Sequence, residues 1–349
     1  MKIARLTDIR AFRIDDAPQP RVAADTDVLI EMKRVGVCGS DIHYYTDGAI
    51  GSQVVAFPWA AGHEGAGIVR DVGGAVTRVK PGDRIAIDPT ISCGKCDQCR
   101  IGRRHTCRRQ KFLGCPGQVE GCLAEWIVLP ESCCFPIPDS VTLEQAALVE
   151  PLSIAVYAMS LALALPDAAM ADIGILGAGP IGQCVLAAAR AEGAQRIFVT
   201  DKIDSRLAVA AKAGAFWTGN PDTGDILAAV AERSPLGLDI VFECSGDTAA
   251  IDQAVDLLRP GGKLLQIGIP GAHNRISMDI NQLRRKEICV QNVRRQNECV
   301  DRAIELVASR TVDIDYLLTH HFALNRTRDA FDLVADYKDG VLKAMIEID

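Results

Sequence analysis

A glycine-rich turn in the middle of the chain is the feature that most restricts how this sequence can fold. Its residues are Gly177, Ala178, Gly179, Pro180, Ile181 and Gly182. They follow a short apolar run, residues 173–176, that predicts a buried strand, and they lead into an alanine-rich stretch, residues 181–191, that predicts a helix. In this setting the first glycine permits a tight turn, the second lets the backbone approach a pyrophosphate, and the third lets the helix pack closely on the strand. The pattern therefore predicts a strand–turn–helix unit that presents a helix N-terminus to the phosphates of a dinucleotide.

The residue at the end of the next strand bears on which dinucleotide binds. Residues 196–200 predict this strand, and Asp201 follows it, about 20 residues after the last glycine of the turn. A carboxylate at this position can hold ribose hydroxyls and repels a ribose phosphate, so the sequence favours NAD over NADP. Arg206 weakens that preference, because a guanidinium group can accept the phosphate. A plain glycine turn with a surface aspartate is the alternative interpretation.

The order of the expected strands and helices divides the chain into two domains, as its length of 349 residues also favours. Residues 1–151 contain short β-like runs punctuated by Gly and Pro, which predict a mainly β domain. Residues 152–290 alternate strands with helices, which predicts βαβ units and a parallel sheet. The strands expected in this second region are 173–176, 196–200, 239–243 and 263–267. Residues 291–349 are less regular, with one expected helix near 300–309 and a strand at 343–348, and we assign them to the first domain.

Four of the thirteen cysteines are crowded together with the spacing C-x2-C-x2-C-x7-C. They are Cys93, Cys96, Cys99 and Cys107. An odd number of cysteines in a chain without a secretory signal makes a disulfide framework a poor explanation. Four thiolates on one short loop instead suit a closed, tetrahedral, structural zinc site. An iron–sulfur cluster and four unrelated thiols are the alternatives, and His105, inside the loop, is expected to be solvated because the four cysteines already fill the site.

A second set of metal-binding residue types is spread along the first domain. It consists of Cys38, His63, Glu64 and Glu150. Three protein ligands and a water are typical of catalytic zinc, although the wide spacing of these residues is weak evidence by itself. The sequence leaves open whether Glu64 or Glu150 is the third ligand.

Several motifs resemble the zinc-containing alcohol dehydrogenases of the medium-chain dehydrogenase/reductase superfamily. The residues similar to the family signature are Gly62–Gly67, Gly73, Val76, Gly82 and Asp83, and the segment Cys38–Tyr44 resembles the catalytic-zinc segment. The four-cysteine loop and the glycine-rich turn occur in the order expected for the family, so the resemblance extends over nearly the whole chain. It implies an α/β fold: a mainly β GroES-like catalytic domain, residues 1–151 and 291–349, and a Rossmann, doubly wound dinucleotide-binding domain, residues 152–290.

Within the superfamily the chain looks closest to sorbitol and xylitol dehydrogenases. The residues that carry this similarity are Tyr44, Gly48–Gly51, Val149–Ser153, Val199–Asp201, Arg206, Arg294 and Leu318–His320. The resemblance implies hydride transfer between a secondary alcohol of a polyol or sugar-like substrate and NAD. It also implies a catalytic and a structural zinc ion, and a homotetramer.

The resemblance further implies a role for each residue of the catalytic-zinc set. Cys38, His63 and Glu64 would bind the catalytic zinc, and Glu150 would hold the metal-bound water or enter the coordination sphere. Asp41 would orient His63, which agrees with the general need of a metal-binding histidine for a carboxylate behind it.

Ser40 and His43 match positions that relay the proton of the alcohol, and Tyr44 and Arg294 match positions that contact the substrate. One departure from the family lies beside Arg294, where Arg295 replaces an aromatic residue. Two adjacent arginines could favour a carboxylate or phosphate on the substrate, whereas a surface salt bridge of Arg295 is the alternative. A second departure is Trp59-Ala60-Ala61, where the family has Met-Val-Leu.

These departures keep other substrates open. A sugar-acid, polyol-phosphate or threonine dehydrogenase of the same superfamily is the main alternative. A non-enzymatic, NAD-binding structural protein is a second alternative, which the presence of Cys38, His63 and Glu64 disfavours.

The formal net charge of -7 disfavours nucleic acid as a partner, since phosphate backbones require a basic face. The charged residues among the first twenty disfavour a secretory signal, and no uninterrupted apolar run is long enough to span a membrane. We therefore expect a cytoplasmic protein that acts on a small-molecule alcohol, without a membrane or nucleic-acid partner.

Overall fold

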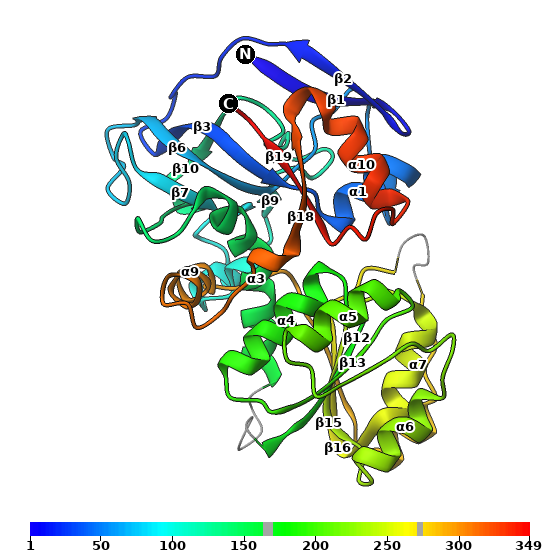
Figure 1. Ribbon diagram of the computed structural model, residues 1–349. Coiled ribbons are helices and arrows are strands. Elements are labelled where there is room, and N and C mark those ends of the chain that lie inside the picture. The colour runs from blue at the N-terminus through cyan, green and yellow to red at the C-terminus, as the bar shows by residue number, and fades with distance from the viewer. Residues whose placement is uncertain (163–169, 271–274) are drawn as a thin grey trace. The chain divides into compact units, whose positions relative to one another are not determined.

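The computed structural model describes residues 1–162, 170–270 and 275–349, and these residues form two compact units. The first unit comprises Met1–Glu150 and Asn297–Asp349, and the second comprises Pro151–Gln296. In Figure 1 the second unit is coloured mainly green and yellow.

The second unit is built on a six-stranded parallel sheet. From one edge to the other its strands are β14 (Trp217–Gly219), β13 (Arg196–Thr200), β12 (Asp172–Leu176), β15 (Leu238–Glu243), β16 (Leu258–Gln266) and β17 (Cys289–Asn292). Numbered along the chain, this order is third, second, first, fourth, fifth and sixth, which defines the Rossmann topology. The change of direction lies between β12 and β15, where ligands of such sheets bind.

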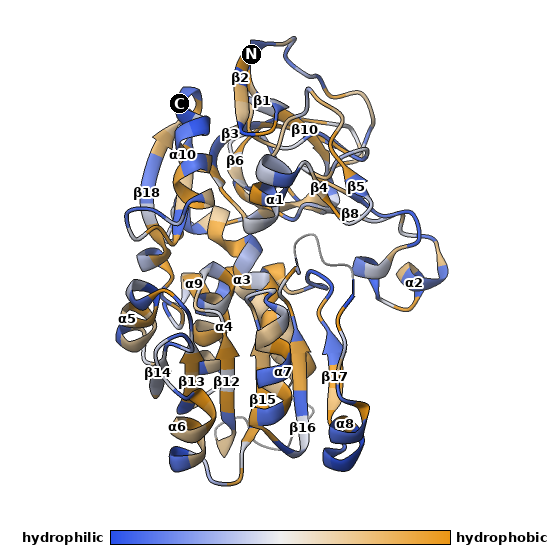
Figure 2. Ribbon diagram, turned by 90° about the vertical axis from the view of Figure 1, so that its right-hand side faces the viewer, coloured by the Kyte–Doolittle hydropathy of each residue, from blue (hydrophilic) through white to orange (hydrophobic). Residues whose placement is uncertain are grey.

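Helices cover both faces of this sheet (Figure 1). They are α4 (Pro180–Ala191), α5 (Asp204–Lys212), α6 (Ile226–Arg233), α7 (Thr248–Leu257) and α8 (Ile280–Lys286). Because both faces are covered, the inner strands are continuous apolar runs rather than alternating ones. Figure 2 shows this for β12, β13 and β15, which are hydrophobic along most of their length.

The first unit contains a seven-stranded sheet. Its strands are β11 (Cys134–Pro136), β7 (Arg84–Ile87), β6 (Glu64–Val72), β3 (Asp27–Gly36), β19 (Lys343–Glu347) and β18 (Leu318–Ala323) in that order, with β10 (Trp126–Pro130) also paired to β3. The C-terminal strand β19 thus joins a sheet made otherwise mainly from the N-terminal part of the chain. This arrangement places Lys343 near the start of β6, a contact that the site uses.

Smaller elements surround this sheet. They are the hairpins β1–β2 (Lys2–Asp8, Ala11–Asp16) and β4–β5 (Ala49–Ile50, Gln53–Val54), the pair β8–β9 (Thr90–Ile91, Lys111–Phe112), and the helices α1 (Gly39–Asp47), α2 (Asp97–Arg100), α9 (Val300–Ala308) and α10 (Thr327–Ala335). Helix α1 carries four of the candidate site residues, so what fixes this helix also fixes part of the site.

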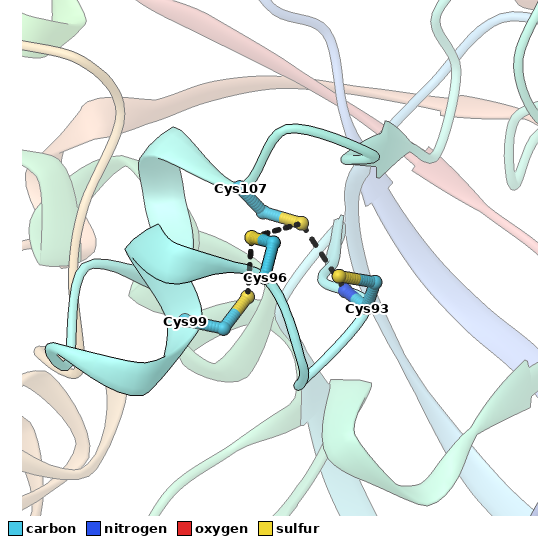
Figure 3. Close-up of side chains that lie close together, drawn as sticks. All are labelled: Cys93, Cys96, Cys99 and Cys107. Carbon is cyan, nitrogen blue, oxygen red and sulfur yellow. Dashed lines mark hydrogen bonds between the residues drawn. The ribbon is translucent and has the colours of Figure 1, made fainter.

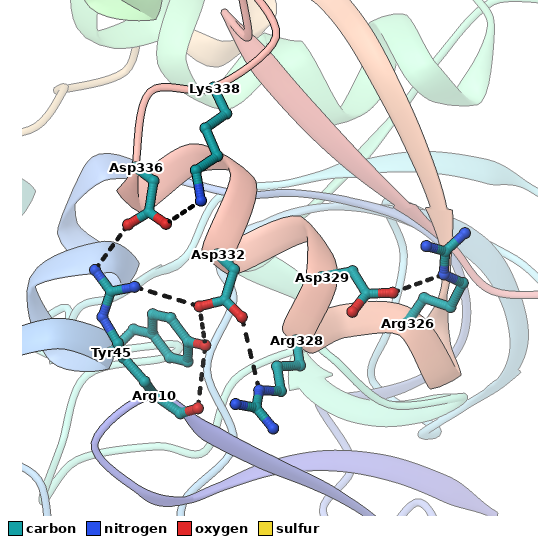
Figure 4. A network of polar contacts seen from close by, with 8 residues as sticks. All are labelled: Arg10, Tyr45, Arg326, Arg328, Asp329, Asp332, Asp336 and Lys338. Carbon is teal, nitrogen blue, oxygen red and sulfur yellow. Dashed lines mark hydrogen bonds and ion pairs between the residues drawn. The ribbon is translucent and has the colours of Figure 1, made fainter.

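A polar network ties α1 to α10 and to the N-terminal hairpin (Figure 4). The fully buried Tyr45 of α1 donates its hydroxyl to Asp332 of α10 at 2.9 Å and to the Arg10 carbonyl at 3.2 Å. Burial and the neighbouring Asp332 raise the pKa of Tyr45, so the phenol stays protonated. Arg10 also reaches Asp336 at 3.0 Å. The buried phenol is the important contact here, since the exposed ion pairs of the network contribute little.

One helix, α3 (Leu143–Ala162), is long and apolar enough to span a membrane by length and composition. Two thirds of its most apolar window is buried inside the protein, as in the core helix of a globular protein. Pro151 interrupts its hydrogen bonding, because proline lacks the backbone N–H.

The expected α/β architecture is confirmed, and the strands and helices predicted in the second unit are present within a few residues of their expected ends. The sequence did not predict α1, α3 or α10. Cys289 is exposed because it lies on β17, which is an edge strand.

Candidate active site

The structure brings Cys38, His63 and Glu64 together although they are far apart in sequence. One potential ligand atom from each lies within 4.8 Å of the others. Cys38 precedes the first turn of α1, and Glu64 is the first residue of β6. The pairing of β3 with β6 sets Glu64 opposite Gly36, two residues before Cys38, and so assembles the set.

Asp41 organises two members of this set from a fully buried position in the first turn of α1. Its carboxylate accepts hydrogen bonds from the backbone N–H of Cys38 and of Gly62, both at 3.3 Å. One of its oxygens lies 3.4 Å from Nδ1 of His63. With Nδ1 directed at Asp41, Nε2 is the nitrogen left for a metal ion, the arrangement typical of metal-binding histidines.

The surroundings of His63 are strongly anionic. Burial alone disfavours its charged form, but Asp41 and Cys38 outweigh burial and raise the pKa of His63 well above its ordinary value. The same anionic surroundings suit a divalent cation, because a buried thiolate and carboxylates need positive charge nearby. The donor set of sulfur, nitrogen and oxygen is one that zinc accepts.

Glu64 is already engaged by a residue from the other end of the chain. Both of its oxygens accept hydrogen bonds from Nζ of Lys343, at 2.5 and 2.6 Å. The two side chains are 1% and 2% exposed, so this ion pair is fully buried. Glu64 can therefore meet a metal ion only while it also balances the charge of Lys343.

Glu150 lies in α3 and is buried, but it does not belong to the three-residue set. Burial is the largest influence and raises its pKa to about 7, with His63 opposing this change and Glu64 reinforcing it. A carboxyl group that is half-protonated near neutral pH can exchange a proton with a nearby ligand. The geometry thus favours Glu64 over Glu150 as the third candidate ligand.

The two expected proton-relay residues both lie on α1. The Ser40 hydroxyl donates to Sγ of Cys38 at 3.4 Å, which places it beside the metal-binding set. Nδ1 of His43 lies 3.3 Å from Asp47, and its side chain is 30% exposed. In the described part of the chain, no hydrogen bond joins Ser40 to His43, so a relay between them needs an intervening hydroxyl or water.

Tyr44, an expected substrate contact, is buried and holds two groups that the sequence did not single out. Its hydroxyl donates to Oε1 of Gln53 at 3.1 Å and lies 4.0 Å from Sγ of Cys115. Gln53 in turn donates from Nε2 to the same sulfur at 3.0 Å. The ring of Tyr44 packs edge-on against Trp59, with centroids 5.4 Å apart.

The four-cysteine loop gathers its sulfur atoms into one cluster (Figure 3). All four lie within 4.8 Å of one another, with Cys96 3.5 Å from Cys99 and 3.8 Å from Cys107. The edge of a tetrahedron with Zn–S bonds of about 2.3 Å is about 3.8 Å. Both distances are close to this edge, so the sulfur cluster suits a tetrahedral zinc ion.

Backbone groups of the loop favour the thiolate forms that metal binding requires. N–H groups of Cys99 and Arg108 lower the pKa of Cys96 to about 6, and those of Cys93 and Arg109 donate to Sγ of Cys107 at 3.3 and 3.4 Å. His105 is 3% exposed, so the expectation that it is solvated was wrong. It lies in a 3-10 turn, Arg104–Thr106, that folds it inward.

The glycine-rich turn connects β12 to α4 in the second unit, as predicted. Gly179 caps the helix, Pro180 is its first residue and Ile181 its second. A Cβ atom on Gly182 would lie 1.8 Å from the carbonyl oxygen of Gly177, so only glycine permits this approach of helix and turn. The N-terminus of α4 is thereby held at the edge of the sheet where a pyrophosphate can bind.

Asp201 stabilises the same turn from the end of β13. One carboxylate oxygen accepts from the Ala178 N–H at 2.7 Å and the other from the Ile203 N–H at 2.8 Å. Arg206 on α5 approaches the turn as well, with Nη1 3.4 Å from the place of a Cβ on Gly179. Both residues thus lie at the dinucleotide-binding edge, where the sequence expected them.

Arg294 and Arg295 follow β17 in the second unit. Arg294 is exposed, and Arg295 is half-buried with a φ of 54°, a conformation that non-glycine residues seldom adopt. Both have interaction partners. Their expected contact with the substrate remains a prediction.

Comparison with known proteins identifies the family. The Alcohol dehydrogenase GroES-like domain matches residues 24–139, and the Zinc-binding dehydrogenase family matches residues 180–309. The chain is 37% identical to a sorbitol dehydrogenase of Bacillus subtilis (strain 168), over 99% of this chain and 97% of that protein. It is 34% identical to an L-idonate 5-dehydrogenase of Vitis vinifera, over 88% and 85% of the two chains.

Among solved structures, a zinc-binding dehydrogenase from Sinorhizobium meliloti 1021 bound to NADP is similar, with a TM-score of 0.89 and 28% identity. The match covers 99% of this chain and 98% of that chain. Together these matches show that the chain belongs to the zinc-dependent alcohol and polyol dehydrogenases of the medium-chain family. The family resemblance predicted from the sequence is confirmed.

The buried ion pair of Glu64 and Lys343 should contribute to the free energy of unfolding. Replacing Lys343→Met leaves the Glu64 carboxylate buried without its partner, so we expect the free energy of unfolding to fall by about 3 kcal/mol. Urea denaturation of the wild-type and variant proteins measures this difference.

The control is Lys338→Met, which removes an exposed lysine paired with Asp336 and should change the free energy of unfolding by less than about 0.5 kcal/mol. A double variant, Lys343→Met with Glu64→Gln, should recover most of the loss, because no buried charge is then left alone. A Lys343→Met variant as stable as Lys338→Met would contradict this account of the site.

Proposed function

We propose that this protein is an NAD-dependent, zinc-containing polyol dehydrogenase, which transfers a hydride between a secondary alcohol of a polyol or sugar-like substrate and the nicotinamide. The observation that carries the proposal is the convergence of Cys38, His63 and Glu64 on one point beside the Ser40 hydroxyl. The similarity to a sorbitol dehydrogenase over nearly the whole length of both chains supports a polyol as the substrate.

The proposed chemistry assigns a task to each group of the site. Cys38, His63 and Glu64 hold the zinc ion, which when bound supplies a Lewis acid that lowers the pKa of the substrate hydroxyl. Asp41 keeps the His63 ring in its binding orientation, and Lys343 balances the charge of Glu64.

Ser40 and His43 would remove the proton of the substrate hydroxyl. The Ser40 hydroxyl lies next to Cys38 and so next to the reacting oxygen, and the partly exposed imidazole of His43 can pass the proton to solvent. A bound nicotinamide would supply the hydride acceptor for the substrate carbon. The four-cysteine cluster has no open coordination position when filled, so we assign it a structural role.

Asp201 supports NAD as the cofactor. Its carboxylate is fixed at the end of β13 by two backbone N–H groups, where it repels a ribose phosphate. Arg206 is close enough to the turn to accept such a phosphate, and a structural relative binds NADP. We therefore expect a preference for NAD rather than an absolute requirement.

A sugar acid is the second candidate substrate. The adjacent Arg294 and Arg295 and the similarity to an L-idonate 5-dehydrogenase favour it. Guanidinium groups pair with carboxylates in a bidentate way that neutral polyols do not use.

A single assay separates these possibilities. We expect the protein to reduce NAD in the presence of a neutral polyol, more efficiently than NADP, and to lose this activity with a zinc chelator. The assay compares polyols, sugar acids and polyol phosphates by the absorbance of the reduced nicotinamide. Turnover of anionic substrates alone would overturn the polyol assignment, and turnover that survives complete zinc removal would overturn the zinc mechanism.

The matched variants are Cys38→Ser and Cys289→Ser, which replace a thiol in the metal-binding set and an exposed thiol on β17. Cys38→Ser should lower turnover on the order of 1,000-fold because it weakens the Lewis acid. Binding of NAD should be unchanged in both variants, since the glycine-rich turn lies in the other unit.

We also propose that the protein is a cytoplasmic homotetramer whose partner is a small-molecule alcohol rather than a membrane or nucleic acid. The similarity to polyol dehydrogenases and the net charge of -7 support this. Light scattering should give a mass about four times that of one chain. A monomeric mass at working concentrations would contradict the assembly.

A further inference from the structure

We propose that Gln53 determines the specificity of this enzyme for polyhydroxylated substrates, by offering its side-chain amide to a second hydroxyl of the substrate. The inference rests on the proposed polyol dehydrogenase function and concerns the same site. Gln53 lies on the short strand β5 and belongs to none of the motifs that the sequence revealed.

The amide of Gln53 is held by two polar contacts. Its Oε1 accepts the hydroxyl of Tyr44 at 3.1 Å, and its Nε2 donates to Sγ of Cys115 at 3.0 Å. Tyr44 and Cys115 are themselves buried, and their own polar atoms are 4.0 Å apart, so the three groups form a closed triangle.

These contacts leave the amide able to bind more. A glutamine side chain has two N–H donors and two oxygen lone pairs. The contacts with Tyr44 and Cys115 use one donor and one lone pair. The remaining donor and acceptor match a hydroxyl group, which both donates and accepts, and Gln53 as a residue is only half-buried.

Two segments place this triangle beside the candidate metal-binding set. Tyr44 follows Ser40 by one turn of α1, so the two side chains project from the same face, and the Ser40 hydroxyl contacts Cys38. On the other side, the Phe112 ring packs against the His63 ring with centroids 5.3 Å apart.

The chain from Phe112 to Cys115 then passes directly along the segment that carries His63. A Cβ atom on Gly114 would lie 2.6 Å from the carbonyl oxygen of Gly62, which shows how closely the two backbones approach. Cys115 is the next residue, and its N–H donates to the Phe112 carbonyl at 3.2 Å. The amide of Gln53 is therefore held between the segment of Ser40 and the segment of His63.

We therefore expect the Gln53 amide to lie beside the reacting centre. A secondary alcohol without further hydroxyl groups forms no hydrogen bond with this amide, whereas a polyol can form one. A site that hydrogen-bonds a substrate hydroxyl discriminates against substrates that lack it. Gln53 is thus a specificity residue, and the Tyr44 hydroxyl and Cys115 thiol position it.

The test compares two substrates in the same preparation. We expect Gln53→Leu to lower kcat/KM for sorbitol about tenfold, the effect of one neutral hydrogen bond, and to preserve or raise kcat/KM for propan-2-ol. The ratio of the two values is independent of the fraction of folded or zinc-loaded enzyme. The matched control is Ser52→Ala, an exposed neighbour in the same hairpin, which should leave the ratio as in the wild type.

The outcomes are distinguishable. An equal loss on both substrates in Gln53→Leu would overturn the inference, because it would assign Gln53 a purely structural role. If the wild-type enzyme oxidises polyols and Gln53→Leu has the same ratio of kcat/KM values as the wild type, the inference is overturned and the proposed function stands. A wild-type enzyme that oxidises no polyol would overturn the proposed function and this inference with it.

Discussion

The concentration of buried negative charge in the first unit is the constraint on which the rest of the structure depends. The carboxylates of Asp41 and Glu64 are almost completely buried and lie around Cys38. A buried carboxylate is tolerated only when it is paired or hydrogen-bonded. Lys343 supplies one positive charge, and in the proposed function a zinc ion held by Cys38, His63 and Glu64 would supply the remainder. Under this proposal the charges of the site balance only with a metal ion.

This balance explains why the C-terminal strand belongs to the N-terminal sheet. β19 pairs with β3, which pairs with β6, so Lys343 at the start of β19 reaches Glu64 at the start of β6. The register of one sheet therefore fixes both the ligand and its counterion. On the other side of the set, Tyr45 and Asp332 hold α1, whose first turn carries Asp41 and Ser40. The second unit is organised independently, around the approach of Gly182 to Gly177.

The sequence predicted what depends on local spacing. The glycine-rich turn and the four-cysteine loop each lie within one segment, so their geometry follows from neighbouring residues. Cys38, His63 and Glu64 depend on sheet register, and only the family resemblance connected them. Lys343 and Gln53 were missed, because each acts through a residue distant in sequence. A lysine at the start of the mostly apolar strand Lys343–Glu347 was the available signal for Lys343. The sequence did not predict helix α1, because polar residues such as Asp41 face inward where an apolar residue is expected.

The central claim is that the buried charge of the first unit exists to hold a zinc ion. Anomalous X-ray scattering from a crystal at the zinc absorption edge tests it most directly. The account predicts two peaks per chain, one at the centre of the four-cysteine cluster and one about 2.3 Å from Sγ of Cys38 and within bonding distance of His63. A fully loaded crystal with a peak only at the four-cysteine cluster, and Glu64 bound to Lys343 alone, would contradict it.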